Sequence, residues 1–295
     1  MAGALNVDHI AHFVPDIDAA GAALEKLGFT LTPFSAQSQR LQPGGPLSSA
    51  GTGNRCVMLD QGYLEFLTPT GRTPVAAALR TAIQRYVGVH LVAFGTRAAE
   101  AEHARLTDEG FTPSPAVALQ RPISTEAGEE TAEFTVVRVL PETMPEGRIQ
   151  YCQHHTPELL WQSRWLEHRN GAVALAGVLL CVENPEEAAE RFGRFTGIAA
   201  RPETNGWTLR TGRGALTFVG ADAFKRTLGV GPPALPWIGG YVLETRKLAR
   251  ARDHLALAGF EVKLMPRDRF AVTLPPELGG VMVFQLPGGS PLNFD

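Results

Sequence analysis

The chain has 295 residues, of which 44% are hydrophobic and 19% charged, and its formal net charge is −3. This length allows two domains of ordinary size, and the composition is that of a soluble globular protein. No segment approaches the roughly 20 uncharged apolar residues of a membrane-spanning helix, and the slightly acidic balance gives no overall reason to bind nucleic acid. We therefore expect a small-molecule partner and neither a membrane nor a nucleic acid.

The N-terminal segment and the cysteines bear on location. The first ten residues, MAGALNVDHI, have neither a basic n-region nor an apolar h-region, which favours the cytoplasm. The cysteines are Cys56, Cys152 and Cys181. They are odd in number, widely spaced and set in apolar runs, which predicts buried reduced thiols and not a disulfide framework or a zinc knuckle.

The first predicted unit has the order βαβββ. Residues 7–20 have the pattern of a strand that runs into a helix, and the helical spacing ends at Gly28. Strands are predicted at 29–34, 54–60 and 62–69. The segment 35–53 is polar and rich in Gly, Pro and Ser, so it is predicted to be a long loop, of a kind that is often functional.

The same order then repeats along the chain. After a helix at 73–86, a strand at 87–96 and a helix at 97–110 precede strands at 111–119, 132–140 and 147–154. Third and fourth copies are predicted at 177–220 and 239–286. Four modules make two pairs, so we predict an N-terminal pair at 1–155, a linker at 156–171 and a C-terminal pair at 172–295. The chain could act as a monomer or a homodimer.

The strands that begin the first two predicted modules each contain a histidine that could have a functional role. A lone histidine on a strand is usually a core or rim residue, so the functional role of His9 needs support from other positions. Strand alternation places His9 on one face with Ala11, and His90 on one face with Val92. Both histidines are therefore predicted to point to the same side of the sheet.

The opening DHIAHFVPDIDAA and the segment GTGNRCVMLDQGYLEFLTP, set in four modules, resemble the vicinal oxygen chelate superfamily, and most of all its glyoxalase-like domain proteins. The resemblance covers almost the whole chain. It implies an α+β fold in which four βαβββ modules form two cupped mixed β-sheets with helices on the outside, the glyoxalase/bleomycin resistance/dihydroxybiphenyl dioxygenase fold. Members place metal ligands on the first and fourth strands of each module.

Carried over to this chain, the resemblance implies a metal site made by His9, Glu65, His90 and Gln150. Two imidazoles, a carboxylate and an amide oxygen suit Fe, Mn, Co, Ni or Zn better than an all-oxygen calcium site. Gln150 stands where the family usually has glutamate, and it would bind metal more weakly. The corresponding C-terminal positions hold no good ligand, so that cup is predicted to be free of metal; they are Gly177, Thr217, Gly239 and Val283.

Other residues are candidates for catalysis or binding. Glu65 and His154 are the candidate catalytic groups, since His154 could act as a base or replace a ligand. Arg55 and Arg148 are the preferred anchors for an anionic substrate, although a solvated strand edge explains each arginine taken singly. Arg121 and Arg138 are further candidates of the same kind. Residues expected to serve packing alone are His12, Met58, Tyr63 and Phe66.

The predicted function is that of a glyoxalase-like metalloenzyme of the isomerase or lyase type, in which a divalent ion stabilises an enolate on a small oxygenated substrate. An extradiol-type dioxygenase that uses His9, His90 and Glu65 is one alternative. A small-molecule binding or resistance protein without catalysis is the other.

Overall fold

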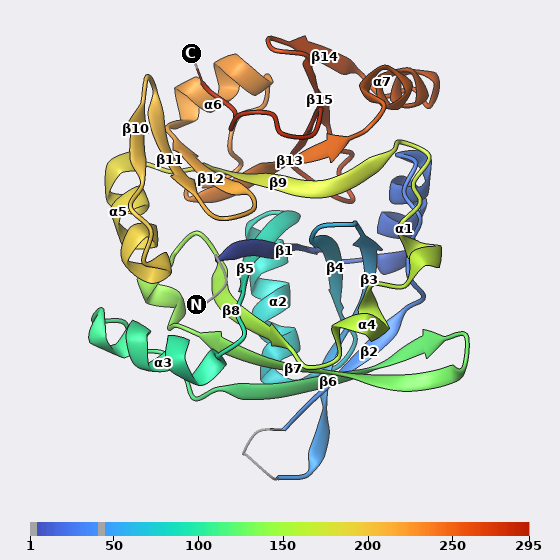
Figure 1. Ribbon diagram of the computed structural model, residues 1–295, viewed down its shortest axis with the longest axis vertical. Coiled ribbons are helices and arrows are strands. Elements are labelled where there is room, and N and C mark those ends of the chain that lie inside the picture. The colour runs from blue at the N-terminus through green and yellow to red at the C-terminus, as the bar shows by residue number, and fades with distance from the viewer. Residues whose placement is uncertain (1–4, 41–44, 295) are drawn as a thin grey trace.

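The computed structural model describes residues 5–40 and 45–294 (Figure 1). Its N-terminal half contains two βαβββ modules joined by α2 (Pro74–Arg85). The first module consists of β1 (Asn6–Phe13), α1 (Ile17–Lys26), β2 (Ser35–Arg40), β3 (Leu47–Met58) and β4 (Tyr63–Pro69). The second consists of β5 (Gly88–Gly95), α3 (Ala99–Asp108), β6 (Val117–Thr125), β7 (Gly128–Arg138) and β8 (Arg148–His154), with the short η1 (Pro141–Thr143) before β8.

The C-terminal half repeats this order after α4 (Pro157–Leu160) and η2 (Ser163–Trp165), which occupy the predicted linker. The third module consists of β9 (Ala172–Cys181), α5 (Pro185–Thr196), β10 (Arg201–Glu203), β11 (Gly206–Arg210) and β12 (Ala215–Val219). After α6 (Ala221–Leu228), the fourth consists of β13 (Trp237–Thr245), α7 (Leu248–Leu257), β14 (Val262–Met265), β15 (Arg269–Thr273) and β16 (Val281–Gln285). The predicted α+β fold of four βαβββ modules is confirmed.

The segment 35–53 is a correction to the sequence-based prediction. Apart from residues 41–44, which lie outside the described chain, it forms β2 and the first half of β3, whereas the predicted strand at 29–34 is not a strand. The two strands pair antiparallel from Ser35 opposite Asn54 to Arg40 opposite Leu47. Polar residues suit these strands because part of β2 lines a cavity that needs polar groups.

The N-terminal strands close into a ring. The order is β1-β4-β3-β2-β6-β7-β8-β5, and β5 pairs again with β1. The C-terminal strands form an open sheet around the β9–β13 pair, with β12-β11-β10 on one side and β16-β15-β14 on the other. The two sheets are joined by the pair Ile238 and Val89 of β13 and β5, and by isolated bridges from Asn6 to Arg213 and from Gln61 to Ala174. Among the described strands, those of the N-terminal half close around a cup, whereas the curved C-terminal sheet stays open.

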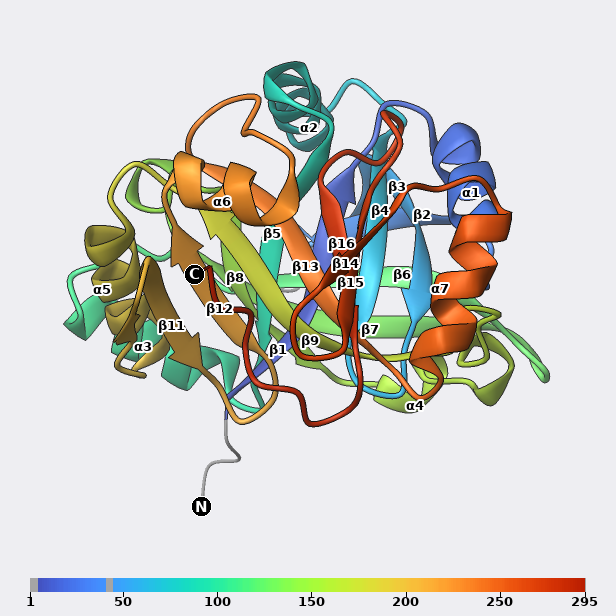
Figure 2. The same cartoon turned by 90° about the horizontal axis from the view of Figure 1, so that it is seen from above.

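Helix ends are set by local chemistry. The side chain of Asp16 accepts hydrogen bonds from the backbone N–H groups of Asp18 and Ala19 and so begins α1. Asn184 caps α5 in the same way, and Gly197 ends that helix in the left-handed conformation with φ 70°. Figure 2 shows α5 and α7 at opposite ends of the open sheet. None of the described helices is long and apolar enough to cross a membrane.

The main apolar core lies between the two halves. It combines the face of β1 that points away from the cup, including Val7 and Ile10, with β9 residues such as Val178 and Leu180. Figure 1 shows β9 running across the N-terminal ring next to β1. A second apolar cluster fills the interior of the ring, where α2 and α4 pack against it. The three cysteines are buried and form no disulfide, as predicted.

Candidate active site

Two irregularities in the β1–β5 pair shape the site. Val7 is opposite Phe94 and His9 is opposite Ala93, so Asp8 is an extra residue on β1. On β5 the extra residue is His90, because Ala11 is opposite Leu91 and His12 opposite Val89. A β-bulge of this kind interrupts the alternation of side chains and re-aims the extra residue.

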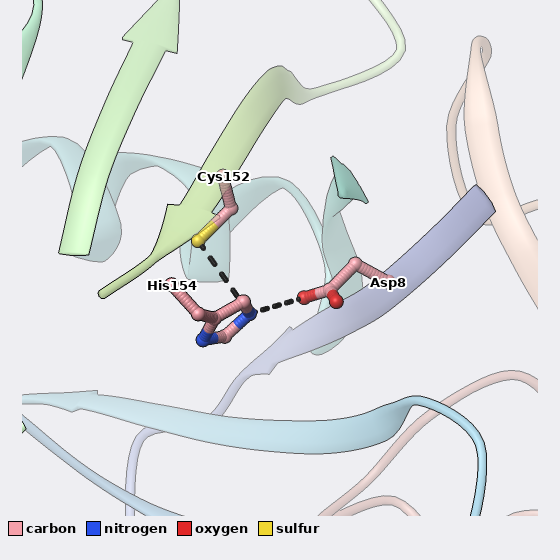
Figure 3. Close-up of side chains that lie close together, drawn as sticks. All are labelled: Asp8, Cys152 and His154. Carbon is pink, nitrogen blue, oxygen red and sulfur yellow. Dashed lines mark hydrogen bonds and ion pairs between the residues drawn. The ribbon is translucent and has the colours of Figure 1, made fainter. Parts of the chain in front are cut away.

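The first bulge brings Asp8 beside His9 and His154. Asp8 Oδ2 accepts hydrogen bonds from His9 Nδ1 at 2.7 Å and from His154 Nε2 at 2.9 Å. Gly95 lies between the strands that carry these residues, and a Cβ there would be 3.4 Å from Asp8 Oδ1, so glycine leaves room for the carboxylate. Figure 3 shows Asp8 on β1 directed toward Cys152 and His154 on β8.

Charge in this cluster is balanced internally. Burial by itself would raise the pKa of Asp8, but the positive charge of His154 and the hydrogen bonds from both histidines hold that pKa well below its usual range. Burial would lower the pKa of His154, whereas its neighbours Cys152 and Asp8 raise it to about 10. We attribute the rise to the Asp8 carboxylate, because burial raises the pKa of Cys152 and keeps it a neutral thiol. The buried pair is therefore Asp8 carboxylate with His154 imidazolium.

The ring encloses a cavity of about 570 Å³, part of it open to solvent. Its polar lining includes His9 and Glu65, and its apolar lining includes Tyr63, whose ring stacks on His9 with centroids 4.3 Å apart. The other charged and amide side chains of the lining are Gln37, Gln120, Arg121, Arg138, Arg148 and Gln150.

Amide side chains hold Glu65 in place. Glu65 Oε1 accepts hydrogen bonds from Asn54 Nδ2 and, at 3.1 Å, from Gln37 Nε2. Asn54 Oδ1 in turn accepts from Arg121 Nη1 at 2.7 Å. The chain of contacts from Arg121 through Asn54 to Glu65 fixes the carboxylate at the cavity wall.

Further along the wall, Arg138 and Arg148 lie near Gln150. Arg138 Nε donates to Gln150 Oε1 at 3.0 Å, and the guanidinium of Arg148 lies over the ring of Phe13, 5.5 Å from its centroid. Burial, followed by the positive charge of Arg148, lowers the pKa of Arg138 to about 9. Both groups remain cationic at neutral pH and are held close together.

The structure brings only part of the predicted ligand set together. His9, Glu65 and Gln150 line the cavity, but His90 does not. As the extra residue of its bulge, His90 stacks on Tyr86 with centroids 3.9 Å apart and donates from Nε2 to the Tyr86 carbonyl at 2.8 Å. The cavity-facing residue of β5 is Leu91. His90 also stacks on Phe13, with ring centroids 5.2 Å apart, and it does not join His9, Glu65 and Gln150 at the cavity wall.

Other predicted residues divide between the cavity and the outer surface of the ring. Arg148 lines the cavity as predicted, whereas Arg55 points to the α1 side, where its Nε donates to the Thr32 carbonyl at 3.1 Å. His154 contacts the site through its hydrogen bond to Asp8.

Tyr63, expected to serve packing alone, lines the cavity as well. His12 packs against Phe66 and against Tyr241 of the C-terminal sheet, not against a helix.

The described residues do not fit a metal ion at the predicted position. Gln150 Oε1 is committed to Arg138, and His90 is committed to a backbone carbonyl. A different group can hold an ion: one ligand atom from each of Asp8, Cys152 and His154 lies within 4.8 Å of the others. His154 Nδ1 is buried and has no partner among the described residues. The carboxylate, thiol and imidazole of this group are donor types that transition metals accept.

Sequence reasoning missed Asp8, Gln37 and Asn54. Regular alternation would place Asp8 on the face opposite His9, and the bulge turns its side chain toward His9 and His154. Gln37 was placed in a loop, although the functional role expected of that segment agrees with its place in the lining. Asn54 was the first residue of a predicted strand, and nothing in the sequence pairs it with Glu65 eleven residues later.

A ring of two βαβββ modules around a polar cup, followed by a second module pair, defines a fold of the vicinal oxygen chelate class. Residues 7–196, more than half of the chain, match the family model described as Glyoxalase-like domain, so the chain belongs to this family. No curated protein matches the chain by sequence.

Solved structures share this fold at low sequence identity. A hypothetical protein from Staphylococcus aureus aligns with a TM-score of 0.64 and 11% identity over 96% of this chain and 99% of that one. A 4-hydroxymandelate synthase variant from Streptomyces coelicolor aligns with 0.60 and 13%, over 98% and 94%. The Mn(II)-bound glyoxalase from Novosphingobium aromaticivorans aligns with 0.56 and 10%, over 96% and 82%.

Proposed function

We propose that the N-terminal cup is the active site of an isomerase or lyase that moves a proton on a small anionic, oxygenated substrate. The observation that carries the proposal is His9, which lines the cavity while its Nδ1 is tied to the Asp8 carboxylate. Because Nδ1 keeps the proton that Asp8 accepts, Nε2 is the nitrogen that can take a proton from a bound molecule.

In this proposal His9 Nε2 removes a proton from a carbon next to a carbonyl group. The electron pair of the broken C–H bond moves into the carbonyl and forms an enolate, and Asp8 stabilises the imidazolium that His9 becomes. Guanidinium groups of the cavity stabilise the enolate oxygen. For a substrate with a hydroxyl group on the carbon that loses the proton, an isomerase completes the reaction when His9 returns the proton to the former carbonyl carbon. The hydroxyl proton passes to the former carbonyl oxygen, so the carbonyl and the alcohol exchange places. Glu65, an acceptor held by amides, would bind a substrate hydroxyl.

A metal-dependent form of the same reaction is a second candidate. The observation in its favour is the closeness of Asp8, Cys152 and His154. These three residues would hold the ion, with Fe, Mn, Co, Ni or Zn as candidates, and a bound ion would supply a Lewis acid for the substrate oxygen. The dioxygenase alternative depends on His9, His90 and Glu65 acting on one ion, and the Tyr86 contact of His90 gives it no support.

Proton exchange with solvent tests the proposal. Small 2-oxo and 2-hydroxy carboxylic acids are incubated with the protein in D₂O, and loss of the C–H signal is followed by NMR. We expect exchange by the wild type and a loss of about 100-fold or more in His9→Gln, because general-base catalysis contributes factors of this order. His155→Gln is the matched control, since His155 is exposed and contacts Thr135.

Three outcomes separate the candidates. Undiminished exchange in His9→Gln would contradict the role of His9. Binding of these acids without exchange would make the chain a binding protein. Exchange that is lost with EDTA and restored by Mn²⁺ would assign the metal-dependent form, and we then expect Cys152→Ser to raise the Mn²⁺ concentration needed to restore exchange.

A further inference from the structure

The positive charges of Arg138 and Arg148 are not balanced by nearby carboxylates of the described residues. Both line the cavity, and no ion pair within 4.0 Å joins either one to a carboxylate of the described residues. Arg138 makes one side-chain hydrogen bond, to Gln150, which leaves its two terminal nitrogens available. Arg148 makes no side-chain hydrogen bond within the described chain and rests on Phe13.

The cavity as a whole has the same imbalance. Three guanidinium groups, those of Arg121, Arg138 and Arg148, share the lining with a single carboxylate, Glu65. Asp8 does not line this cavity, and its side-chain contacts are with His9 and His154. Partly buried cations without a counterion are costly, so such a lining favours a bound molecule that carries about two negative charges.

The positions of the arginines separate the charges into two places. Arg138 on β7 is opposite Gln150 on β8, and Gln150 follows Arg148 by two residues on the same strand. The guanidinium groups of Arg138 and Arg148 therefore lie at the same end of the cavity. Arg121 on β6 is opposite Ala132, six residues before Arg138 along β7, and it is tied to Asn54. A ligand that reaches both places needs two separated anionic groups.

We propose that the cup binds a small dianion directly, with one anionic group between Arg138 and Arg148 and the other toward Arg121. This inference rests on the proposed function, because the dianion is the class of substrate that the proposed enzyme would act on. Two carboxylates, or a carboxylate and a phosphate, share this chemistry. Planar guanidinium groups bind both anions through paired N–H donors.

Isothermal titration calorimetry in EDTA tests the proposal. The probes are malonate, succinate and glutarate, with propionate as the monoanion and inorganic phosphate as the other dianion. We expect the wild type to bind at least one dicarboxylate about tenfold or more tighter than propionate, since the second charge adds its own contact. Arg138→Gln and Arg148→Gln should each weaken binding by roughly 10- to 100-fold. Arg55→Gln is the matched control, because Arg55 lies outside the cavity.

Each outcome has a defined meaning. Tighter binding of phosphate than of every dicarboxylate, with the same dependence on Arg138 and Arg148, overturns the two-place ligand in favour of a single phosphate between these two arginines. Binding that disappears in EDTA, that equals the binding of propionate, or that survives both arginine substitutions overturns the inference. Circular dichroism and melting of each variant check that it is folded.

Failure here can be distinguished from failure of the proposed function. If His9→Gln abolishes proton exchange while both arginine variants bind dicarboxylates normally, the proton-transfer proposal stands and the dianion inference falls. If the arginines bind the dianion but His9→Gln exchanges as fast as the wild type, the site binds dianions and the role of His9 falls.

Discussion

His12, His90 and His154 differ in charge because their hydrogen-bond partners differ. His9 and His154 both donate to the Asp8 carboxylate. His12 donates from Nδ1 to the Leu278 carbonyl at 2.9 Å, and His90 donates to the Tyr86 carbonyl. A carbonyl accepts one proton without favouring a full positive charge, so burial dominates and lowers the pKa of His12 and of His90 to about 4.

The lowered pKa values of His12 and His90 predict that the free energy of unfolding falls in acid. Their folded pKa values lie below the unfolded value near 6.5, so the unfolded chain takes up protons first as the pH falls. The stabilisation is complete above about pH 6.5 and is lost as the pH falls toward 4, by about 3 kcal/mol for each histidine. Urea unfolding at several pH values measures this loss.

The variant His12→Gln isolates one contribution. His12 Nε2 is buried without a partner among the described residues, so a proton placed there finds no acceptor. Glutamine can still donate to the Leu278 carbonyl but does not titrate, so we expect a shallower fall in stability between pH 6.5 and 4 than in the wild type. An equally steep fall in His12→Gln would show that other groups cause the acid sensitivity.

At the scale of elements, the bulges in the β1–β5 pair decide which polar groups enter the cup. The extra residue on β1 turns Asp8 toward His154 on β8, and the extra residue on β5 turns His90 toward Tyr86. Between the two bulges, Leu91 occupies the cavity wall. The pairing of the two strands therefore determines both the Asp8 contact of His9 and the absence of His90 from the cavity wall.

The Asp8 contact predicts the tautomer of His9. An ionised Asp8 accepts from Nδ1, so neutral His9 should be protonated at Nδ1 and not at Nε2. Histidine ¹⁵N NMR of the wild type should report this form, and Asp8→Asn should shift the population toward the other tautomer and slow proton exchange by about 100-fold. Asp60→Asn is the control, since Asp60 pairs with Arg246 away from the cavity. An Nε2-protonated His9 in the wild type would contradict the proposed base.

At the scale of the whole molecule, the two halves share their largest core. The face of β1 opposite the cup packs on β9, and Arg105 of α3 donates from Nη1 to the Arg194 carbonyl of α5 at 3.0 Å. The division at 1–155, 156–171 and 172–295 remains a prediction, because a repeat in the chain need not be a unit that folds alone. The shared core suggests that each half depends on the other.

A fragment test addresses this dependence. Residues 1–171 expressed alone would expose the apolar face that includes Val7, Ile10 and Leu64. We expect this fragment to aggregate or to melt without cooperativity, and we expect addition of the fragment 172–295 to restore a cooperative transition. Calorimetry and gel filtration measure both. A cooperative melt of 1–171 as a monomer would show that the N-terminal half is an independent domain.

Several features could be predicted from the amino-acid sequence because they depend on local pattern. The four modules, the helices that end at Gly28 and Gly110, and the buried reduced cysteines follow from periodicity and end signals. The resemblance to the glyoxalase-like proteins implied His9, Glu65 and Gln150 as site residues, and Arg148 was a candidate anchor for an anionic substrate. All four line the cavity. Alternation holds wherever strand pairing is regular.

Only the tertiary structure decided the rest. Alternation along one strand cannot predict a bulge, because the extra residue is defined by the pairing with the partner strand. For this reason the sequence did not predict that Asp8 contacts His9 or that His90 is absent from the cavity wall. The pairing of β2 with β3 likewise brought Gln37 to Glu65 from a segment that has the composition of a loop. The sequence by itself determined the class of fold and the side chains available to the cup, while the register between strands far apart in the chain selected which of them meet.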